Sequence, residues 1–252
     1  MNEPIVCSIG CTDPWNAAGL GLDIRALAEC GAYPVTVVAG ITAQNRAGVS
    51  AASPTPPDLL AAQFASLAEA GIAAYRIGAL LDIPTVTLVA EYLAGTRVPA
   101  VYDPVFAPSG GGSFAGAAVC DAIRERLVPI VAVVTPNLGE AALLAGRDVS
   151  DVREMESAGR DFVARGAGAA LIKGGHLRDS LADVLVDDAG TVVYEDRRLG
   201  AGLRGTGCLL AASLAVSLAR GEPLRDAVAT ARTFVRTKIA HPQTRGGMSL
   251  AY

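Results

Sequence analysis

The sequence lacks the features that mark membrane-spanning, secreted and multidomain proteins. Its 252 residues contain no uncharged apolar stretch that approaches the roughly 18 residues of a membrane span. The start, Met1 to Pro4, has neither the basic nor the apolar segment of a secretory leader. No Pro/Ser-rich linker, internal repeat or low-complexity tract interrupts the chain. We therefore expect one domain spanning residues 1–252, a cytoplasmic location and no membrane partner.

Positive charge and cysteine are also scarce. The 21 Lys and Arg residues are scattered and are outnumbered by 25 Asp and Glu residues, which gives a formal net charge of -4. This balance argues against nucleic acid as a partner. The 5 cysteines form no CxxC pair, and an odd number is a poor disulfide framework. We expect a reduced protein without structural zinc.

The distribution of apolar residues predicts an α/β fold. Short β-branched runs alternate with longer alanine- and leucine-rich segments, as in repeated βα units around a mostly parallel sheet. Residues 184–186 and 192–194 predict a hairpin instead. The predicted strands span residues 5–9, 34–39, 76–78, 98–103, 130–135 and 169–173. The predicted helices span residues 20–30, 58–70, 85–94, 114–127, 138–145, 152–165, 206–219 and 224–239.

Polar residues follow most of the predicted strands. Ligands of an open parallel sheet bind beyond the carboxyl ends of its strands, so these positions bear most directly on function. Each segment alone has an ordinary explanation as a helix cap or a turn. Together they supply two carboxylates for magnesium and a lysine for phosphate, which phosphoryl transfer requires. The segments are Gly10-Cys11-Thr12-Asp13-Pro14, Thr42-Ala43-Gln44-Asn45, Asp103-Pro104-Val105, Thr135-Pro136-Asn137-Leu138-Gly139-Glu140 and Lys173-Gly174-Gly175-His176.

The turn Gly205-Thr206-Gly207-Cys208 precedes a long apolar run that predicts a buried helix. Its glycines allow backbone N–H groups to approach a ligand closely, which predicts an anion hole. At the positive end of the helix dipole, Cys208 is expected to ionise more readily than a free thiol of pKa ~8.5. The alternative is that Cys208 is a small apolar residue that starts a buried helix. Because the sequence has no GxxxxGK[ST] motif, the chain is not expected to be a P-loop enzyme.

These motifs resemble the ribokinase-like superfamily and, within it, the hydroxymethylpyrimidine/phosphomethylpyrimidine kinases of thiamin biosynthesis. That group is closely related to the cysteine-type pyridoxal kinases, whereas most ribokinase relatives have aspartate at the position of Cys208. The resemblance implies a three-layer α/β/α sandwich with a mostly parallel central sheet. It is carried by Gly10-Cys11-Thr12-Asp13-Pro14, Gly19 with Asp23, Gly31-Ala32-Tyr33, Ala43-Gln44-Asn45, Ile77-Gly78, Asp103-Pro104-Val105, Thr135-Pro136-Asn137 with Glu140, Lys173-Gly174-Gly175-His176 and Gly205-Thr206-Gly207-Cys208, in that order.

The resemblance also implies a catalytic centre at the glycine turn. Cys208 would take the proton of a substrate hydroxymethyl group, and N–H groups of the turn would stabilise the transferred phosphoryl group. ATP and Mg²⁺ are the implied cofactors. The implied residues are Cys208, Gly205, Thr206 and Gly207 for catalysis, Lys173, Asn137 and Thr206 for the nucleotide, and Asp103 and Glu140 for magnesium.

The implied substrates are 4-amino-5-hydroxymethyl-2-methylpyrimidine and its monophosphate, which would be converted to the diphosphate. An amide both donates and accepts hydrogen bonds, so Gln44 can satisfy a ring nitrogen and an exocyclic amine of an aminopyrimidine. The resemblance further implies a homo-oligomer, a dimer. The residues implied for the pyrimidine pocket are Gln44, Asp23, Gly19, Gly10 and Val105.

Two departures from the family pattern affect the expected substrate. The stretch from Trp15 to Gly19 replaces a glycine-rich loop, and Arg204 replaces the histidine that is common before the glycine turn. An arginine there can add a phosphate contact or block the usual geometry. Two alternatives therefore stay open: a cysteine-type pyridoxal kinase, and a non-catalytic pyrimidine-binding regulatory relative.

Overall fold

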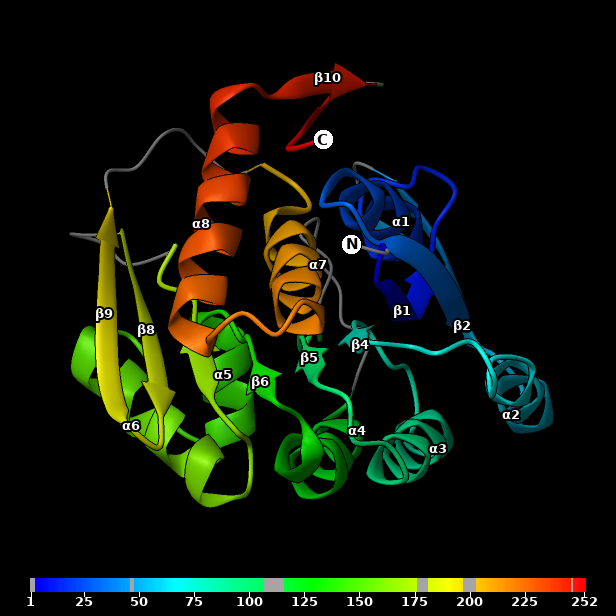
Figure 1. Cartoon of the computed structure of the whole chain (residues 1–252), viewed down its shortest axis with the longest axis horizontal. Coiled ribbons are helices and arrows are strands. Elements are labelled where there is room, and N and C mark those ends of the chain that lie inside the picture. The colour runs from blue at the N-terminus through cyan, green and yellow to red at the C-terminus, as the bar shows by residue number, and fades with distance from the viewer. Residues whose placement is uncertain (1–2, 46–47, 107–115, 176–180, 197–202, 246) are drawn as a thin grey trace.

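A nine-stranded sheet forms the centre of this computed structural model, which describes residues 3–45, 48–106, 116–175, 181–196, 203–245 and 247–252 (Figure 1). Buried strands of a parallel sheet need apolar side chains on both faces, and the β-branched runs of this chain supply them. The strands of this sheet are β1 (Ile5–Thr12), β2 (Tyr33–Asn45), β3 (Gly48–Pro54), β4 (Ala74–Ile77), β5 (Ala100–Tyr102), β6 (Val133–Val134), β7 (Ala170–Ile172), β8 (Leu181–Asp187) and β9 (Gly190–Asp196).

The six central strands run parallel, in the spatial order β2-β1-β4-β5-β6-β7. At the edges, β3 pairs antiparallel with β2, and the predicted hairpin of β8 and β9 pairs antiparallel with β7. A separate two-stranded sheet joins β10 (Gln243–Arg245) to β11 (Met248–Leu250). The carboxyl ends of the six parallel strands therefore share one edge of the sheet.

Helices cover both faces of the sheet, so the molecule has three layers (Figure 1). Successive strand residues point to opposite faces: Val101 belongs to one apolar core, and its neighbours Ala100 and Tyr102 belong to the other. The helices against the first face are α1 (Gly19–Glu29), α7 (Thr206–Ala219) and α8 (Leu224–Ala240). Those against the second are α2 (Pro57–Ser66), α3 (Ile83–Ala94), α4 (Ala117–Ala122), which continues as a π-helical segment (Ile123–Leu127) and a 3₁₀ turn (Val128–Ile130), α5 (Leu138–Ala145) and α6 (Val152–Ala164).

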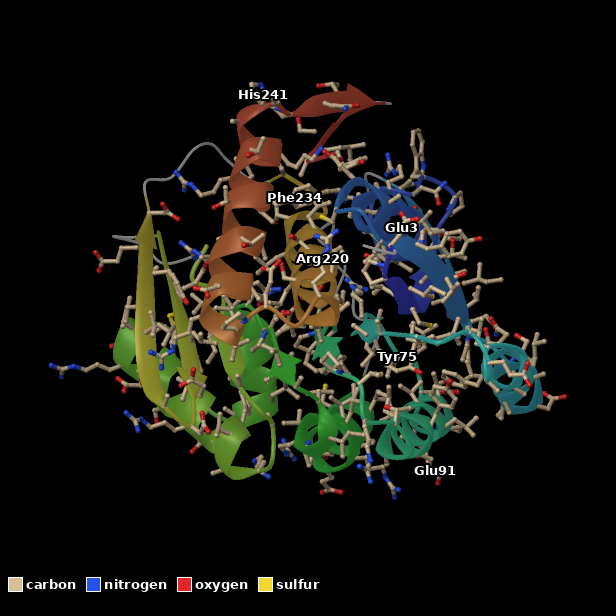
Figure 2. All side chains as sticks on the ribbon, in the orientation of Figure 1. Glu3, Tyr75, Glu91, Arg220, Phe234 and His241 are labelled. Atoms are coloured by element: carbon tan, nitrogen blue, oxygen red, sulfur yellow. The ribbon has the colours of Figure 1, made fainter. Side chains whose placement is uncertain are left out.

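Helix α7 is the most enclosed helix, because every residue from Cys208 to Ser217 is buried. It contacts α1 and α8 on either side and lies over β1, β4 and β5. Side chains fill the space between sheet and helices, while charged groups such as Glu91 on α3 lie at the periphery (Figure 2). The first turn of α7 is thus held at the carboxyl edge of the sheet.

The predicted α/β fold and the hairpin are confirmed, but several predicted strand ends are wrong. Strand β1 continues past Ile9 to Thr12, and β6 begins at Val133 rather than Ile130 because residues 128–130 form a 3₁₀ turn. The sequence predicts that the second strand ends at Ala39, whereas β2 continues to Asn45 and pairs with β3, which was not predicted. In this part of β2 the buried positions carry Gly40 and Thr42 while Ile41 is exposed, and most of β3 is exposed, so apolar residues do not mark a buried face there. Within the described residues, no helix combines the length and the apolar character needed to cross a membrane.

Candidate active site

Three charged side chains from different strand ends meet at the carboxyl edge of the sheet. Asp103 follows β5, Lys173 follows β7, and Glu140 lies in the first turn of α5, just after β6. The Nζ atom of Lys173 lies 2.7 Å from Oδ1 of Asp103 and 4.0 Å from Oε2 of Glu140. Asp103 and Lys173 are 70 residues apart in the sequence, and the fold brings their charges into contact.

The glycine turn faces this cluster. A Cβ atom on Gly207 would lie 3.1 Å from Nζ of Lys173 and 3.6 Å from each carboxylate oxygen of Asp103. Gly205 has φ +88, and a Cβ there would lie 2.5 Å from Cδ2 of Leu22. Among the described residues no side chain caps α7, so the N–H groups of its first turn keep their capacity to bind an anion.

An arginine that sequence reasoning placed in a strand without a role extends the cluster inward. Arg76 of β4 is 1% exposed, and its Nη2 lies 3.1 Å from Oδ2 of Asp103. Its Nη1 lies 3.0 Å from Oδ2 of Asp23, which also accepts a hydrogen bond of 2.7 Å from the Ser8 hydroxyl. The available signal was a charged residue inside the short apolar strand Ala74–Ile77, since a buried charge requires a partner.

Asp103 and Lys173 are a charged pair in this setting. Burial opposes ionisation of Asp103, but Lys173 and Arg76 hold its pKa below the ordinary value. Burial also opposes the charge of Lys173, while Asp103 and Glu140 hold its pKa above the ordinary value. Each group therefore favours the ionised state of the other, so Lys173 presents a positive charge to the first turn of α7.

Cys208 corrects the prediction of a readily ionised thiol. The side chain is 8% exposed, and burial raises its pKa to about 11. Arg76 and a hydrogen bond from the Gly19 backbone act in the lowering direction, but Asp23 and Asp103 act against them. The helix dipole is outweighed because the N-terminus of α7 is itself buried among carboxylates. At neutral pH the residue is a thiol.

Asn137 and Glu140 form a reciprocal cap at the start of α5. The Asn137 side chain accepts a hydrogen bond of 3.0 Å from the Glu140 backbone, and the Asn137 backbone donates one of 2.7 Å to Glu140 Oε2. Burial raises the pKa of Glu140 to about 7; Lys173 opposes this shift and Asp103 adds to it. Both residues thus have a structural role beside any ligand contact.

The carboxylates Asp103 and Glu140 were predicted to position magnesium. Both Asp103 oxygens already face cations, Lys173 and Arg76, and the described residues contain no group of three or more His, Cys, Asp or Glu side chains that could hold a metal. Mg²⁺ in phosphotransferases is commonly held by one or two carboxylates together with substrate phosphates. The pair fits a magnesium ion that arrives with a nucleotide, rather than a site made wholly of protein ligands.

The predicted substrate residues lie in two places. Asp23 and Gly19 belong to α1, where a Cβ on Gly19 would lie 2.3 Å from the Cys11 carbonyl oxygen, and Gly10 lies near Gly78 in the adjoining strand end. Val105 follows β5 directly and donates its backbone N–H to the Asp103 carbonyl. Asp23 is thus part of the charged cluster itself, and Val105 is hydrogen-bonded to the backbone of Asp103.

Gln44 lies farther out, on the part of β2 that pairs with β3. The neighbouring Asn45 carbonyl accepts a hydrogen bond of 3.3 Å from Arg204, the residue before the glycine turn. Arg204 therefore connects the strand that carries Gln44 to the anion hole. Trp15 is 47% exposed, and His176 lies outside the described residues.

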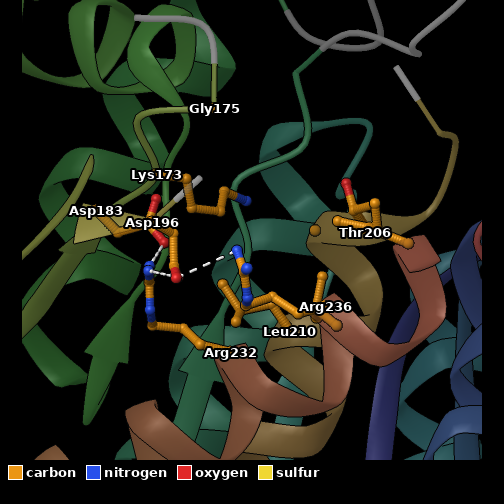
Figure 3. Close-up of a pocket in the computed structure, with 11 residues that line it drawn as sticks. Lys173, Gly175, Asp183, Asp196, Thr206, Leu210, Arg232 and Arg236 are labelled. Atoms are coloured by element: carbon orange, nitrogen blue, oxygen red, sulfur yellow. Dashed lines mark hydrogen bonds and ion pairs between the residues drawn. The ribbon is translucent and has the colours of Figure 1, made fainter. Parts of the chain in front are cut away.

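A cavity of about 150 Å³ adjoins the anion hole and was not predicted (Figure 3). Arg232 of α8 pairs in its wall with Asp183 and, at 2.5 Å, with Asp196; Arg236 lies 3.3 Å from the other Asp196 oxygen. The spacing of the two arginines along α8 places them on one face, but only the fold brings β8 and β9 opposite. The cavity is lined by Lys173, Gly175, Asp183, Asp196, Thr206, Gly207, Leu210, Arg232, Val235, Arg236 and Ile239.

Comparison with known proteins shows what the chain is similar to. Residues 13–250 match the family model described as phosphomethylpyrimidine kinase. Over 249 residues the chain is 35% identical to the hydroxymethylpyrimidine/phosphomethylpyrimidine kinase of Streptomyces coelicolor, which covers 98% of this chain and 93% of that protein. The resemblance noted from short motifs therefore extends through nearly the whole sequence.

Solved structures agree with this result. The ADP complex of Bacillus subtilis pyridoxal kinase has a TM-score of 0.90 at 27% identity, covering 99% of this chain and 97% of that one. Phosphomethylpyrimidine kinase from Clostridium difficile 630 has a TM-score of 0.84 at 25% identity, covering 94% of this chain and 100% of that one. The predicted ribokinase-like fold is confirmed.

The raised pKa of Cys208 predicts slow alkylation at neutral pH. Because the thiolate is the reactive form, the rate of iodoacetamide labelling at Cys208 should rise about tenfold per pH unit from pH 7.5 to 9.5. Mass spectrometry of the Cys208 peptide measures this rate, and Cys208→Ser identifies the signal. A rate that levels off below pH 8 would instead support the easily ionised thiol expected from the helix dipole.

The crowding around Gly205 predicts a difference between two glycine substitutions. Gly205 and Gly221 both have positive φ, +88 and +77, but only Gly205 has neighbours close to the added Cβ. Alanine at either site should lower the free energy of unfolding by about 1–2 kcal/mol through backbone strain. Only Gly205→Ala should also weaken ADP binding in calorimetry, by about tenfold or more, because it displaces the first turn of α7. Equal ADP affinity in the two variants would contradict this.

Proposed function

The chain belongs to the phosphomethylpyrimidine kinase family, and we propose that it phosphorylates 4-amino-5-hydroxymethyl-2-methylpyrimidine and then the resulting monophosphate, with ATP as donor. The product is the pyrimidine diphosphate that thiamin biosynthesis uses. The observation that carries the proposal is the position of Lys173 and Asp103 directly before the first turn of α7, beside Cys208. A charged cluster, an anion hole and a thiol that meet at one point form a phosphoryl-transfer site.

The glycine turn and Lys173 bind the phosphoryl group that is transferred. Backbone N–H groups of Thr206 and Gly207 point to the place where negative charge develops, and the Lys173 ammonium lies opposite them. Since Gly207 has no side chain, Lys173 and a phosphate can both approach the helix end closely. The residues stabilise charge in position without having to reorganise during the reaction.

The cavity beside the anion hole is the proposed nucleotide site. Its inner end contains Thr206, Gly207 and Lys173, which suits phosphates, and its α8 wall contains the apolar Val235 and Ile239. Leucine, valine and isoleucine side chains suit the faces of a purine base, while Asp183 and Asp196 keep Arg232 in place. ATP would thus lie along α8 with its γ-phosphate at the glycine turn.

Magnesium and Asn137 complete the phosphate end of the site in this proposal. Asp103 and Glu140 would hold Mg²⁺ from the protein side, and the bound ion would neutralise charge on the phosphate chain. The amide nitrogen of Asn137 remains available to a phosphate oxygen, because the cap of α5 engages its side-chain oxygen. Glu140, whose pKa is about 7, would ionise more fully next to a bound cation.

Cys208 is the proposed proton acceptor for the hydroxymethyl group. Its thiolate takes the hydroxyl proton as the substrate oxygen attacks the γ-phosphorus, and the bond to the bridging oxygen of ADP breaks. Because the pKa of Cys208 is about 11, the thiolate is a minor form at neutral pH. Positioning and charge carry much of the catalysis in phosphoryl transfer, and the proton acceptor adds to them.

Pyridoxal is the second candidate substrate, because the TM-score to a pyridoxal kinase, 0.90, is no lower than the 0.84 to a phosphomethylpyrimidine kinase. Both reactions phosphorylate a hydroxymethyl group on a nitrogen heterocycle, so the same centre serves either. The non-catalytic alternative is disfavoured by the intact contact of Lys173 with Asp103. The dimer implied by the family resemblance stays a prediction.

Release of ADP with a panel of substrates tests the proposed function. We expect turnover with hydroxymethylpyrimidine and with its monophosphate, slower turnover or none with pyridoxal, and a loss of about 100-fold or more in kcat for Cys208→Ala. If none of the three compounds releases ADP, the kinase assignment is wrong. Full activity of Cys208→Ala would remove the cysteine from the mechanism while leaving the kinase assignment intact.

Replacing Lys173 separates charge stabilisation from simple folding effects. Lys173→Ala should lower kcat by about 100-fold or more, since it removes the cation opposite the anion hole. The matched control is Lys238→Ala, which removes an ion pair with Glu29 on the far side of α8 and should keep wild-type kcat. Both variants are compared by thermal unfolding. An unchanged kcat in folded Lys173→Ala would show that the ammonium does not contact the transferred group.

A further inference from the structure

Arg76 is the most buried positive charge of the site, and the proposed chemistry above does not use it. Its guanidinium lies between two carboxylates, 3.0 Å from Asp23 and 3.1 Å from Asp103, and all three side chains are at most 2% exposed. A buried ion pair of this kind is seldom more stable than well-packed apolar residues of the same volume. Stability alone therefore gives no reason for an arginine in the middle of the central sheet.

Within the described part of the chain, two polar atoms of this cluster lack hydrogen-bond partners, and one of them belongs to Asp23, a residue predicted to bind the substrate. Oδ1 of Asp23 and Nε of Arg76 are buried and have no hydrogen-bond partner among the described residues. An unpartnered buried acceptor is unfavourable unless a ligand supplies the donor. Asp23 is thus held by Arg76 and Ser8 through one oxygen, while the other oxygen is left for a donor group.

Arg76 also fixes the orientation of Asp103, the carboxylate that pairs with Lys173. One Asp103 oxygen is engaged by Arg76 and the other by Lys173, at 3.1 and 2.7 Å. The guanidinium also interacts with the sulfur of Cys208. A single planar group therefore contacts Asp23, which is predicted to face the substrate, and Asp103, which pairs with Lys173, and its charge acts on the proposed proton acceptor. Only a forked guanidinium reaches several partners in this way.

We propose that Arg76 is a positioning residue for phosphoryl transfer, which holds Asp23, Asp103 and Cys208 in the one arrangement where substrate and γ-phosphate meet. The proposal rests on the proposed kinase function. It differs from a purely structural role in its consequence: a small displacement of the guanidinium impairs the reaction even when the protein is folded and every charge is present.

A substitution at Gly78 can displace the Arg76 guanidinium while every charged residue of the cluster is kept. A Cβ atom at Gly78 would lie 2.2 Å from Nη1 of Arg76, so Gly78→Ala forces the guanidinium to move. Its backbone conformation is not of the kind that favours glycine, so alanine is tolerated by the main chain. Gly95→Ala is the matched control, because the nearest atom to its added Cβ, the Tyr92 carbonyl oxygen, lies at 3.5 Å.

The experiment compares wild type, Gly78→Ala, Gly95→Ala and Arg76→Lys by steady-state kinetics and thermal unfolding. We expect kcat to fall about 100-fold in Gly78→Ala, as for a misplacement near 1 Å, with the KM for ATP changed less than threefold and Gly95→Ala like wild type. A kcat within twofold of wild type in folded Gly78→Ala would overturn the proposal. If Gly78→Ala fails to fold, Arg76→Lys decides in the same way, since it keeps the charge but loses the fork.

A second measurement does not depend on turnover. Alkylation of Cys208 at pH 8.5 should slow several-fold in Gly78→Ala and Arg76→Lys, because a positive group beside the sulfur is moved, while alkylation of the partly buried Cys30 stays constant. Unchanged labelling of Cys208 in both variants would contradict the proposed arrangement. Inactive wild type with slowed labelling in the variants would refute the kinase function and keep the arrangement, so the two failures are distinguishable.

Discussion

The burial of helix α7 determines most properties of this site. The helix lies between α1 and α8 above the parallel strands, so its N-terminus ends inside the protein at the carboxyl edge of the sheet. Open backbone N–H groups in such a place bind anions far more strongly than at a surface, because little water competes with the ligand. The same enclosure demands glycine at 205 and 207, where a side chain would meet Leu22 or Lys173.

Enclosure also explains why charges near the turn come in balanced sets. Asp23, Arg76, Asp103 and Lys173 form a buried chain of alternating sign, and an isolated member would be strongly unfavourable there. The chain leads from the pocket predicted for the pyrimidine to the position predicted for phosphate. Cys208 lies beside it, and burial raises the pKa of its thiol even though Arg76 acts in the lowering direction.

Some residues of the site could be predicted from the sequence and others could not. Lys173, Asp103 and Glu140 follow buried strands, and parallel strands align their ends, so their convergence was predictable from order along the chain. The arginine in β4 and the Arg232 cluster on α8 were not, because each depends on which strand lies opposite. The extension of β2 to Asn45, paired with β3, escaped prediction because its buried positions carry Gly40 and Thr42 while the apolar Ile41 is exposed.

The sequence by itself determined the fold class, the glycine turn and the residue types of a phosphoryl-transfer site, because these follow from local periodicity and from the spacing of short motifs. Only the tertiary structure decided the ionisation of Cys208 and the partners of Arg76. A helix dipole is a local property that sequence reveals, whereas burial and neighbouring charge are sums over residues distant in the chain. At Cys208 the distant contributions outweigh the local one, so the residue is a thiol at neutral pH.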